Sequence, residues 1–136
     1  AIMYNNALVV VENMGPGGAV LSALQHTHFY DNLYYESNKA ANAKPGVRVN
    51  QTNRTQFLET LQNRLINHTV RINSARFVNE LNTFEYNKVT RKAQAQKGKH
   101  DDAIMAMCIG LFVRDSLVRE IPLGSGPSKD TLQAVK

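Results

Sequence analysis

Asp101 and Asp102 are the residues whose types and spacing most directly indicate chemistry. The two adjacent acids precede residues 103–113, the longest apolar run of the chain. An aspartate is a preferred N-cap and the helix dipole stabilises acids in the first turn, so one of the two has a structural role. The second is left without that role, and paired carboxylates on a rigid helix can bind a divalent cation. A cation site and a merely acidic helix start are the two interpretations of this pair.

Glu12 is a third acid in a position that chemistry could use. It follows the apolar residues 7–11 and precedes the glycine-rich residues 15–18. In α/β proteins, functional sites gather at the carboxyl ends of strands. A glutamate that ends a strand and simply meets water is the alternative interpretation.

The basic residues gather in two stretches. Lys and Arg number 16 and Asp and Glu number 11, which gives a net charge of +5. Nine of the bases stand in two acid-free stretches: Lys39, Lys44, Arg48 and Arg54, and then Lys88, Arg91, Lys92, Lys97 and Lys99. A surface that binds a polyanion is one interpretation, and two solvated loops are the other.

Other patterns exclude several classes of protein and site. The single cysteine, Cys108, rules out an intramolecular disulfide, and its place in an apolar helix predicts an inert core residue. No basic-then-apolar signal segment is found, and the apolar run of eleven residues is shorter than the roughly 20 that a membrane span needs. Residues 15–18 lack the Gly-Lys-Ser/Thr of an ATP phosphate loop. The histidines show no metal-ligand spacing with Cys108.

The elements that must position these residues alternate between strands and helices. Hydrophobic spacing and turn residues predict strands over residues 7–11, 30–35 and 70–72, with an edge strand within 89–96. They predict helices over residues 19–25, from a cap at Thr52 or Asn53 to about 67, from Ser74 through Phe84, and over 101–117. Residues 37–50 are expected to form a loop, and residues from 122 a tail. The alternation indicates an α/β layer fold.

Ordered blocks of this sequence resemble the C-terminal nuclease domain of the large terminase subunit of tailed bacteriophages. The blocks are Val9-Val-Val-Glu-Asn-Met-Gly15, Leu33-Tyr-Tyr-Glu36, Thr52-Asn-Arg54 with the helix after it, residues 70–72, Phe77-Val-Asn-Glu-Leu81 with Phe84, and Gly98-Lys-His-Asp-Asp-Ala-Ile-Met-Ala106. The resemblance covers about residues 7–117. It implies a ribonuclease H-like fold, a mixed sheet flanked by helices. We therefore expect a nuclease-like domain over residues 1–118 and a tail or linker over 119–136.

The resemblance also implies an activity and a set of site residues. The family members are metal-dependent endonucleases that cut concatemeric double-stranded DNA during packaging, with two Mg²⁺ or Mn²⁺ ions clamping the scissile phosphate. Glu12 matches the second family acid and Asp102, or Asp101, matches the last; Asp102 is preferred because residues 102–106 resemble the helix start of related resolvases. His100 matches a frequent neighbour. The DNA contacts are expected from the basic stretches, at Lys39, Arg54, Arg91, Lys92, Lys97 and Lys99.

One departure from the family pattern qualifies the expected activity. The first catalytic aspartate of the family lies on a strand upstream of the position that Glu12 matches, so we expect an N-terminally incomplete domain that cuts poorly alone and self-associates. The expected partners are double-stranded DNA, the ATPase motor domain and other packaging components, in the cytoplasm of the infected bacterial host, with no membrane. Two rivals stay open: a non-catalytic DNA-binding or packaging-interaction module on the same fold, and another ribonuclease H-like nuclease such as a resolvase or transposase.

Overall fold

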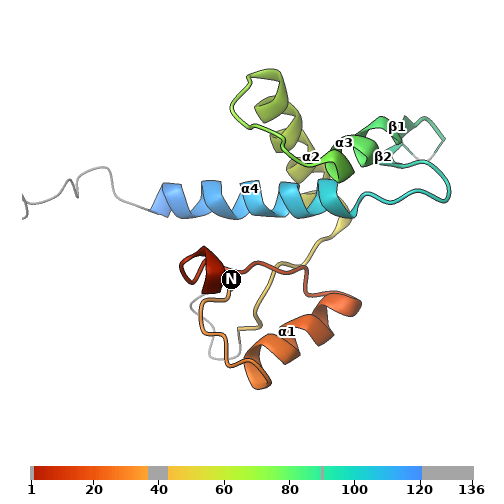
Figure 1. Ribbon diagram of the computed structural model, residues 1–136. Helices are drawn as coiled ribbons and strands as arrows, with labels where there is room; N and C mark the ends of the chain where they lie inside the picture. Colours follow the sequence, from red (N-terminus) through yellow and green to blue (C-terminus); the bar gives the residue numbers. More distant parts are fainter. Residues whose placement is uncertain (1, 37–42, 90, 121–136) are drawn as a thin grey trace, which may run out of the picture.

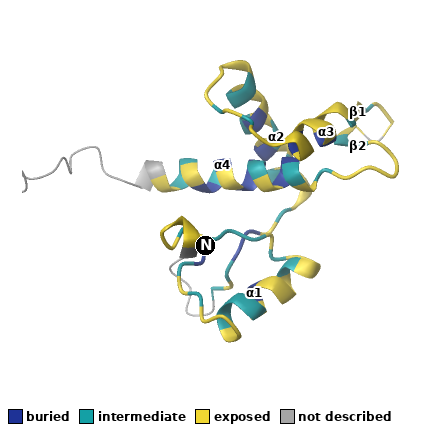
Figure 2. Ribbon diagram, viewed as in Figure 1, coloured by how far each residue is buried: buried dark blue, intermediate teal, exposed yellow. Residues whose placement is uncertain are grey.

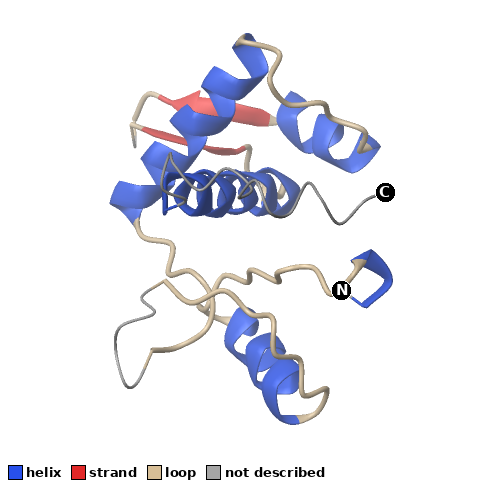
Figure 3. Ribbon diagram, turned by 90° about the vertical axis from the view of Figure 1, so that its left-hand side faces the viewer, coloured by secondary structure: helices blue, strands red, loops and turns tan. Residues whose placement is uncertain are grey.

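Helix α4 (Asp102–Glu120) lies in the middle of the molecule, and the other elements lie on either side of it (Figure 1). The computed structural model describes residues 2–36, 43–89 and 91–120. The elements before α4 are the 3-10 helix η1 (Ile2–Tyr4), α1 (Pro16–His26), α2 (Gln51–Ile66), α3 (Ala75–Asn82), β1 (Phe84–Asn87) and β2 (Lys92–Ala95). On one side of α4 lie α2, α3 and the β1–β2 hairpin, and on the other lies α1 with the extended residues 7–13 (Figure 3).

The hydrophobic core lies where α4 packs against α2 and α3 (Figure 2). Apolar residues recur at three- and four-residue steps along α2, so this helix turns one apolar stripe inward, whereas α4 is apolar on several faces over residues 103–113. The rings of Phe57 and Phe112 meet with centroids 4.6 Å apart. Cys108 is fully buried and burial raises the pKa of its thiol to about 12, which confirms its place in the core. The buried cluster comprises Val47, Phe57, Leu61, Phe77, Ile104, Met105, Cys108, Ile109, Leu111 and Val113.

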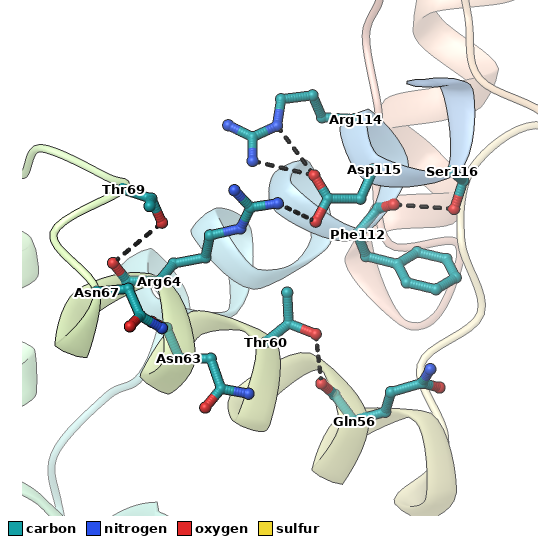
Figure 4. Close-up of polar contacts among 10 residues, drawn as sticks. All are labelled: Gln56, Thr60, Asn63, Arg64, Asn67, Thr69, Phe112, Arg114, Asp115 and Ser116. Carbon is teal, nitrogen blue, oxygen red and sulfur yellow. Dashed lines mark hydrogen bonds and ion pairs between the residues drawn. The ribbon is translucent and has the colours of Figure 1, made fainter. Parts of the chain in front are cut away.

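Two ion pairs join α2 to α4, one near each end. Arg54 pairs with Asp101 just before α4 begins. Toward the other end of α4, Arg64 donates a 2.7 Å hydrogen bond to Asp115 (Figure 4). Burial alone would raise the pKa of Asp115, but hydrogen bonds from Arg64 and Arg114 outweigh that effect and lower it. The two pairs fix the direction in which α4 crosses α2. Within the described ranges, no helix combines the length and the apolarity that a membrane crossing requires.

The fold is mixed α/β, as expected, but most expected strands do not form ladders. Among the described residues, the strands that form a ladder are β1 and β2, which pair antiparallel with Phe84 opposite Ala95. The strands expected over 7–11 and 30–35 are extended segments joined by a single parallel bridge between Val9 and Leu33, and Glu12, just after the first segment, forms another with Val47. Each bridge is isolated because residues 7–13 meet one neighbour near their start and another near their end.

Residues 7–13 have one hydrogen-bonded edge and one open edge. Val9 and Val11 make their backbone hydrogen bonds along the same edge, to the segments around residues 33 and 47. Neighbouring residues of an extended chain direct their backbone groups to opposite edges. Leu8 and Val10 therefore face the other edge, where no described residue hydrogen-bonds to their N–H or C=O groups.

Two glycines allow other segments to approach the residues that lead to Glu12. A Cβ on Gly17, in α1, would overlap the carbonyl oxygen of Glu12. A Cβ on Gly46 would overlap the carbonyl oxygen of Val11, and Gly46 also has a φ of 91°, which favours glycine. These close approaches hold Glu12 between α1 and residues 45–47.

Several helix starts differ from those expected. α1 begins at Pro16, so the glycine-rich segment opens a helix and is not a separate turn; proline at N1 has a suitable fixed φ. Asn50 caps α2, where Thr52 or Asn53 was expected, because its side chain accepts from both of their backbone N–H groups. The Ser74 cap of α3 is confirmed, with its hydroxyl accepting from the backbone of Phe77.

Other boundaries are also corrected. α3 ends at Asn82, and Phe84 opens β1 instead of continuing the helix. Residues 70–72 form no strand, because Val70 and Ile72 pack against the core without a pairing partner. The edge strand expected within 89–96 is β2. α4 continues through residue 118 to Glu120, and the tail expected from residue 122 lies outside the described residues.

Candidate functional site

The first turn of α4 brings together acids from two parts of the chain. Asp101 precedes the helix, with its carbonyl accepting from Met105 N–H at 2.9 Å, and Asp102 is the first helical residue. Side-chain capping comes from Glu80 of α3, whose Oε2 accepts from the backbone N–H groups of Ala103 at 2.6 Å and Ile104 at 3.3 Å. The expectation that one aspartate side chain caps the helix is thus corrected.

Sequence reasoning missed Glu80, although a signal for it exists. Glu80 lies one turn after Phe77 and four residues before Phe84, on the stripe that turns toward the core. An acid on such a stripe indicates a buried carboxylate with fixed partners, because burial of an unpaired charge is costly. Its partner backbone lies 23 residues farther along the chain.

Each aspartate of the pair is held by a different arginine. Arg54 of α2 donates to Asp101 Oδ2 at 2.5 Å, and both side chains are less than one-third exposed. Arg76 of α3 donates to Asp102 Oδ2 at 3.3 Å, and the Asp102 side chain is 70% exposed. Asp102 is therefore the more accessible and less firmly held of the two carboxylates.

Glu12, Asp101 and Asp102 line the same cleft. The cleft has a volume of about 580 Å³, and Arg54 completes its polar part. Its apolar walls come from Leu8, Val10 and Val11 on one side and from residues of α4 on the other, namely Met105, Ala106, Ile109 and Gly110. Acids about 90 residues apart in sequence thus face one space, beside the open edge of residues 7–13.

The donor types in this cleft fit a divalent cation, but they do not form a compact cluster. All three side chains are carboxylates, the oxygen ligands that Mg²⁺ and Mn²⁺ accept. Among residues 2–36, 43–89 and 91–120, no group of three or more His, Cys, Asp or Glu side chains could hold a metal ion. The chain itself would supply a few carboxylate ligands, and water would have to complete the coordination.

A basic groove adjoins the acidic cleft through Arg54. Arg54 lines both, and the groove, of about 300 Å³, runs between α2 and the β1–β2 hairpin. Arg91, Lys92 and the exposed ring of Tyr86 also line it, and Glu59 is the one acid among the described residues that do so. Three of the expected DNA-contacting residues are therefore gathered next to the carboxylates.

The remaining expected residues are more scattered. Lys99 and His100 line a third hollow, of about 690 Å³, together with Arg76 of α3. Lys97 is exposed in the turn before them. His100 thus lies on the Arg76 side of Asp102 and does not line the acidic cleft. Lys39 lies outside the described residues.

The comparisons with known proteins add no family. No protein-family model matches the chain. A search of curated proteins also finds no match.

Proposed function

We propose that this chain is the nuclease domain of a phage DNA-packaging terminase, a metal-dependent endonuclease that cuts double-stranded DNA on a ribonuclease H-like fold. One observation carries the proposal: Glu12 lines the same cleft as Asp101 and Asp102. The ordered sequence blocks support it, since they assign to these same three residues the second and last acids of that family. By the same resemblance, the partners are an ATPase motor and other packaging components in the infected host cell.

In this proposal the acidic cleft and the adjoining basic groove have different roles. Glu12 and Asp102 would hold the cation, and Asp101, paired with Arg54, fixes the start of α4 beside them. A divalent cation held there would supply an activated water and neutralise charge on the scissile phosphate. Arg91 and Lys92 bind backbone phosphates in the adjoining groove, which positions the duplex without selecting a sequence.

The open edge of residues 7–13 supports the expectation of an incomplete site. The family carries its first aspartate on a strand upstream of the acid that Glu12 matches. Leu8 and Val10 lie on the wall of the acidic cleft, and no described residue hydrogen-bonds to their backbone groups, so such a strand could pair there. A carboxylate on that strand would raise the number of ligands and allow a second ion.

Plasmid nicking tests the proposal. Supercoiled DNA is incubated with Mg²⁺ or Mn²⁺, with and without chelator, using this chain and the full-length product of its gene. We expect little nicking by the 136-residue chain and chelator-sensitive cutting by the full product, abolished by Glu12→Ala or Asp102→Ala. Asp115→Ala, an acid of α4 that pairs with Arg64, is the matched control and should retain cutting. Cutting that survives both site substitutions, or no cutting by the full product, would contradict the proposal.

A non-catalytic DNA-binding module is the second candidate. The ion pairs that engage Asp101 and Asp102 favour it, because the two arginines already neutralise both acids. This function predicts DNA binding that is unchanged by chelator and by Glu12→Ala, with no cutting. A preference for branched junctions over linear duplex would instead identify a resolvase-type nuclease.

A further inference from the structure

Glu80 is a buried carboxylate that the proposed mechanism does not use. It is 8% exposed, and among the described residues it is the one charged residue that is buried. Its Oε2 accepts from two backbone N–H groups of α4, and its Oε1 accepts from Arg76 Nε at 2.9 Å. Both oxygens are therefore engaged, one by the helix and one by the arginine. Burial alone would raise the pKa of Glu80, but the hydrogen bonds from Arg76 and the α4 backbone lower it.

Arg76 is shared between Glu80 and Asp102, and the sharing is unequal. The contact to Glu80 is 2.9 Å, and the contact to Asp102 is 3.3 Å. The Glu80 side chain is 10% exposed against 70% for Asp102, so water screens the pair with Glu80 much less. The guanidinium is thus held mainly by the buried carboxylate.

We infer that Glu80 is a positioning residue that keeps the Asp102 carboxylate available to a divalent cation. It does so by capping the helix that carries Asp102 and by holding Arg76, which would otherwise pair fully with Asp102. The inference rests on the proposed cation site.

The charge of Glu80, and not only its shape, is needed for this role. A glutamine at position 80 would keep one oxygen to accept from the α4 backbone. Its other terminal group would be an amide NH₂, a donor facing the Arg76 donors. Arg76 would then have Asp102 as its remaining carboxylate partner among those it contacts here.

Mn²⁺ titration of the full 136-residue chain, followed by electron paramagnetic resonance of the free ion, tests the inference. Glu80→Gln should weaken Mn²⁺ binding about tenfold or more, as is typical when a residue that orients a metal ligand is changed. The double variant Glu80→Gln/Arg76→Gln should recover most of that loss, because the competing cation is gone. Ser74→Ala is the matched control: it removes the cap of α3 without touching Glu80, and should bind Mn²⁺ like the wild type. Thermal unfolding of each variant reports its stability.

The outcomes separate this inference from the proposed function. Mn²⁺ binding that is lost in Asp102→Asn but unchanged in Glu80→Gln would overturn the inference and leave the site standing. Equally weak binding by Glu80→Gln and the double variant would also overturn it, since a purely structural loss is not rescued. Arg76→Gln alone, an exposed position, should bind as well as the wild type or better, and weaker binding would contradict the inference. Binding indifferent to Asp102→Asn would overturn both the site and the inference.

Discussion

Glu80 should leave a signature in the acid stability of the protein. Its pKa in the folded chain lies below the ordinary value of 4.5, so the unfolded chain takes up the proton first as the pH falls. Its contribution to stability is therefore complete above pH 4.5 and is lost as the pH falls through the folded-state value. We expect Glu80→Gln to be less stable than the wild type at neutral pH, with the difference shrinking in acid. Thermal unfolding midpoints of the wild type and of Glu80→Gln, measured from neutral to acidic pH, test this prediction. A difference that stays constant with pH would contradict it.

Individual residues of the site differ in how far the sequence reveals them. Asp101 and Asp102 stand out because two acids precede an apolar helix, and Glu12 because it follows an apolar run. We expected Glu12 and Asp102 to converge because of the family resemblance and because Glu12 ends an apolar run and Asp102 begins a helix. Arg76 could not be assigned to the site, because its contact with Asp102 depends on how α3 packs on α4. Local spacing carries no information about such a contact.

At the scale of the elements, the N-cap of α2 can be tested directly by substitution. The Asn50 side chain accepts from two backbone N–H groups. The Asn53 side chain donates to the carbonyl oxygen of Arg48, and its Oδ1 accepts from the backbone N–H of Asn50. We expect Asn50→Ala to lower the free energy of unfolding by about 1 kcal/mol, measured by urea denaturation. Thr52→Ala, at an exposed position that the sequence also marked as a cap, is the control and should change it by less. Equal losses would contradict the assigned cap.

The elements that the sequence predicts well are those that depend on their own periodicity. The helix around Phe57 and Leu61 and the helix that begins after Ser74 repeat apolar residues at helical spacing, and both form. The strands expected over 7–11 and 70–72 depend instead on partners elsewhere in the chain. The first obtains a single bridge, at Val9, and the second obtains none, although both contain β-branched residues.

At the scale of the whole molecule, the basic residues predict the salt dependence of DNA binding. If about five of them contact phosphates, the logarithm of the affinity should fall with the logarithm of salt concentration with a slope near −4.5, at roughly −0.9 per contact. Replacing Lys92, Lys97 and Lys99 with glutamine should flatten the slope, measured by fluorescence anisotropy. Arg71→Gln, outside the two basic stretches, is the control and should leave it unchanged. An unchanged slope in the triple variant would show that DNA is bound elsewhere.

The open edge of residues 7–13 predicts self-association. Unpaired backbone groups next to apolar side chains are a template for pairing with another strand. We expect the chain to form concentration-dependent oligomers in sedimentation experiments, and Leu8→Lys, which places a charge beside that edge, to reduce them. Val89→Lys changes a more exposed apolar residue away from the edge and is the control. Oligomers that persist in Leu8→Lys but vanish in Val89→Lys would assign the association to the hairpin turn.

The first turn of α4 is built from segments that leave the ribosome well before it. Asp101 pairs with Arg54, which lies 47 residues upstream, and the backbone N–H of Ala103 donates to Glu80, which lies 23 residues upstream. Chains are synthesised from the N-terminus at about 5–20 residues per second, so α2 and α3 wait several seconds for the helix that covers them. During that interval their apolar faces are exposed to chaperones, and the basic residues of the hairpin precede the paired acids. A chain that stops before residue 101 therefore carries cationic surface without the acidic pair, and translation itself sets when the cleft is complete.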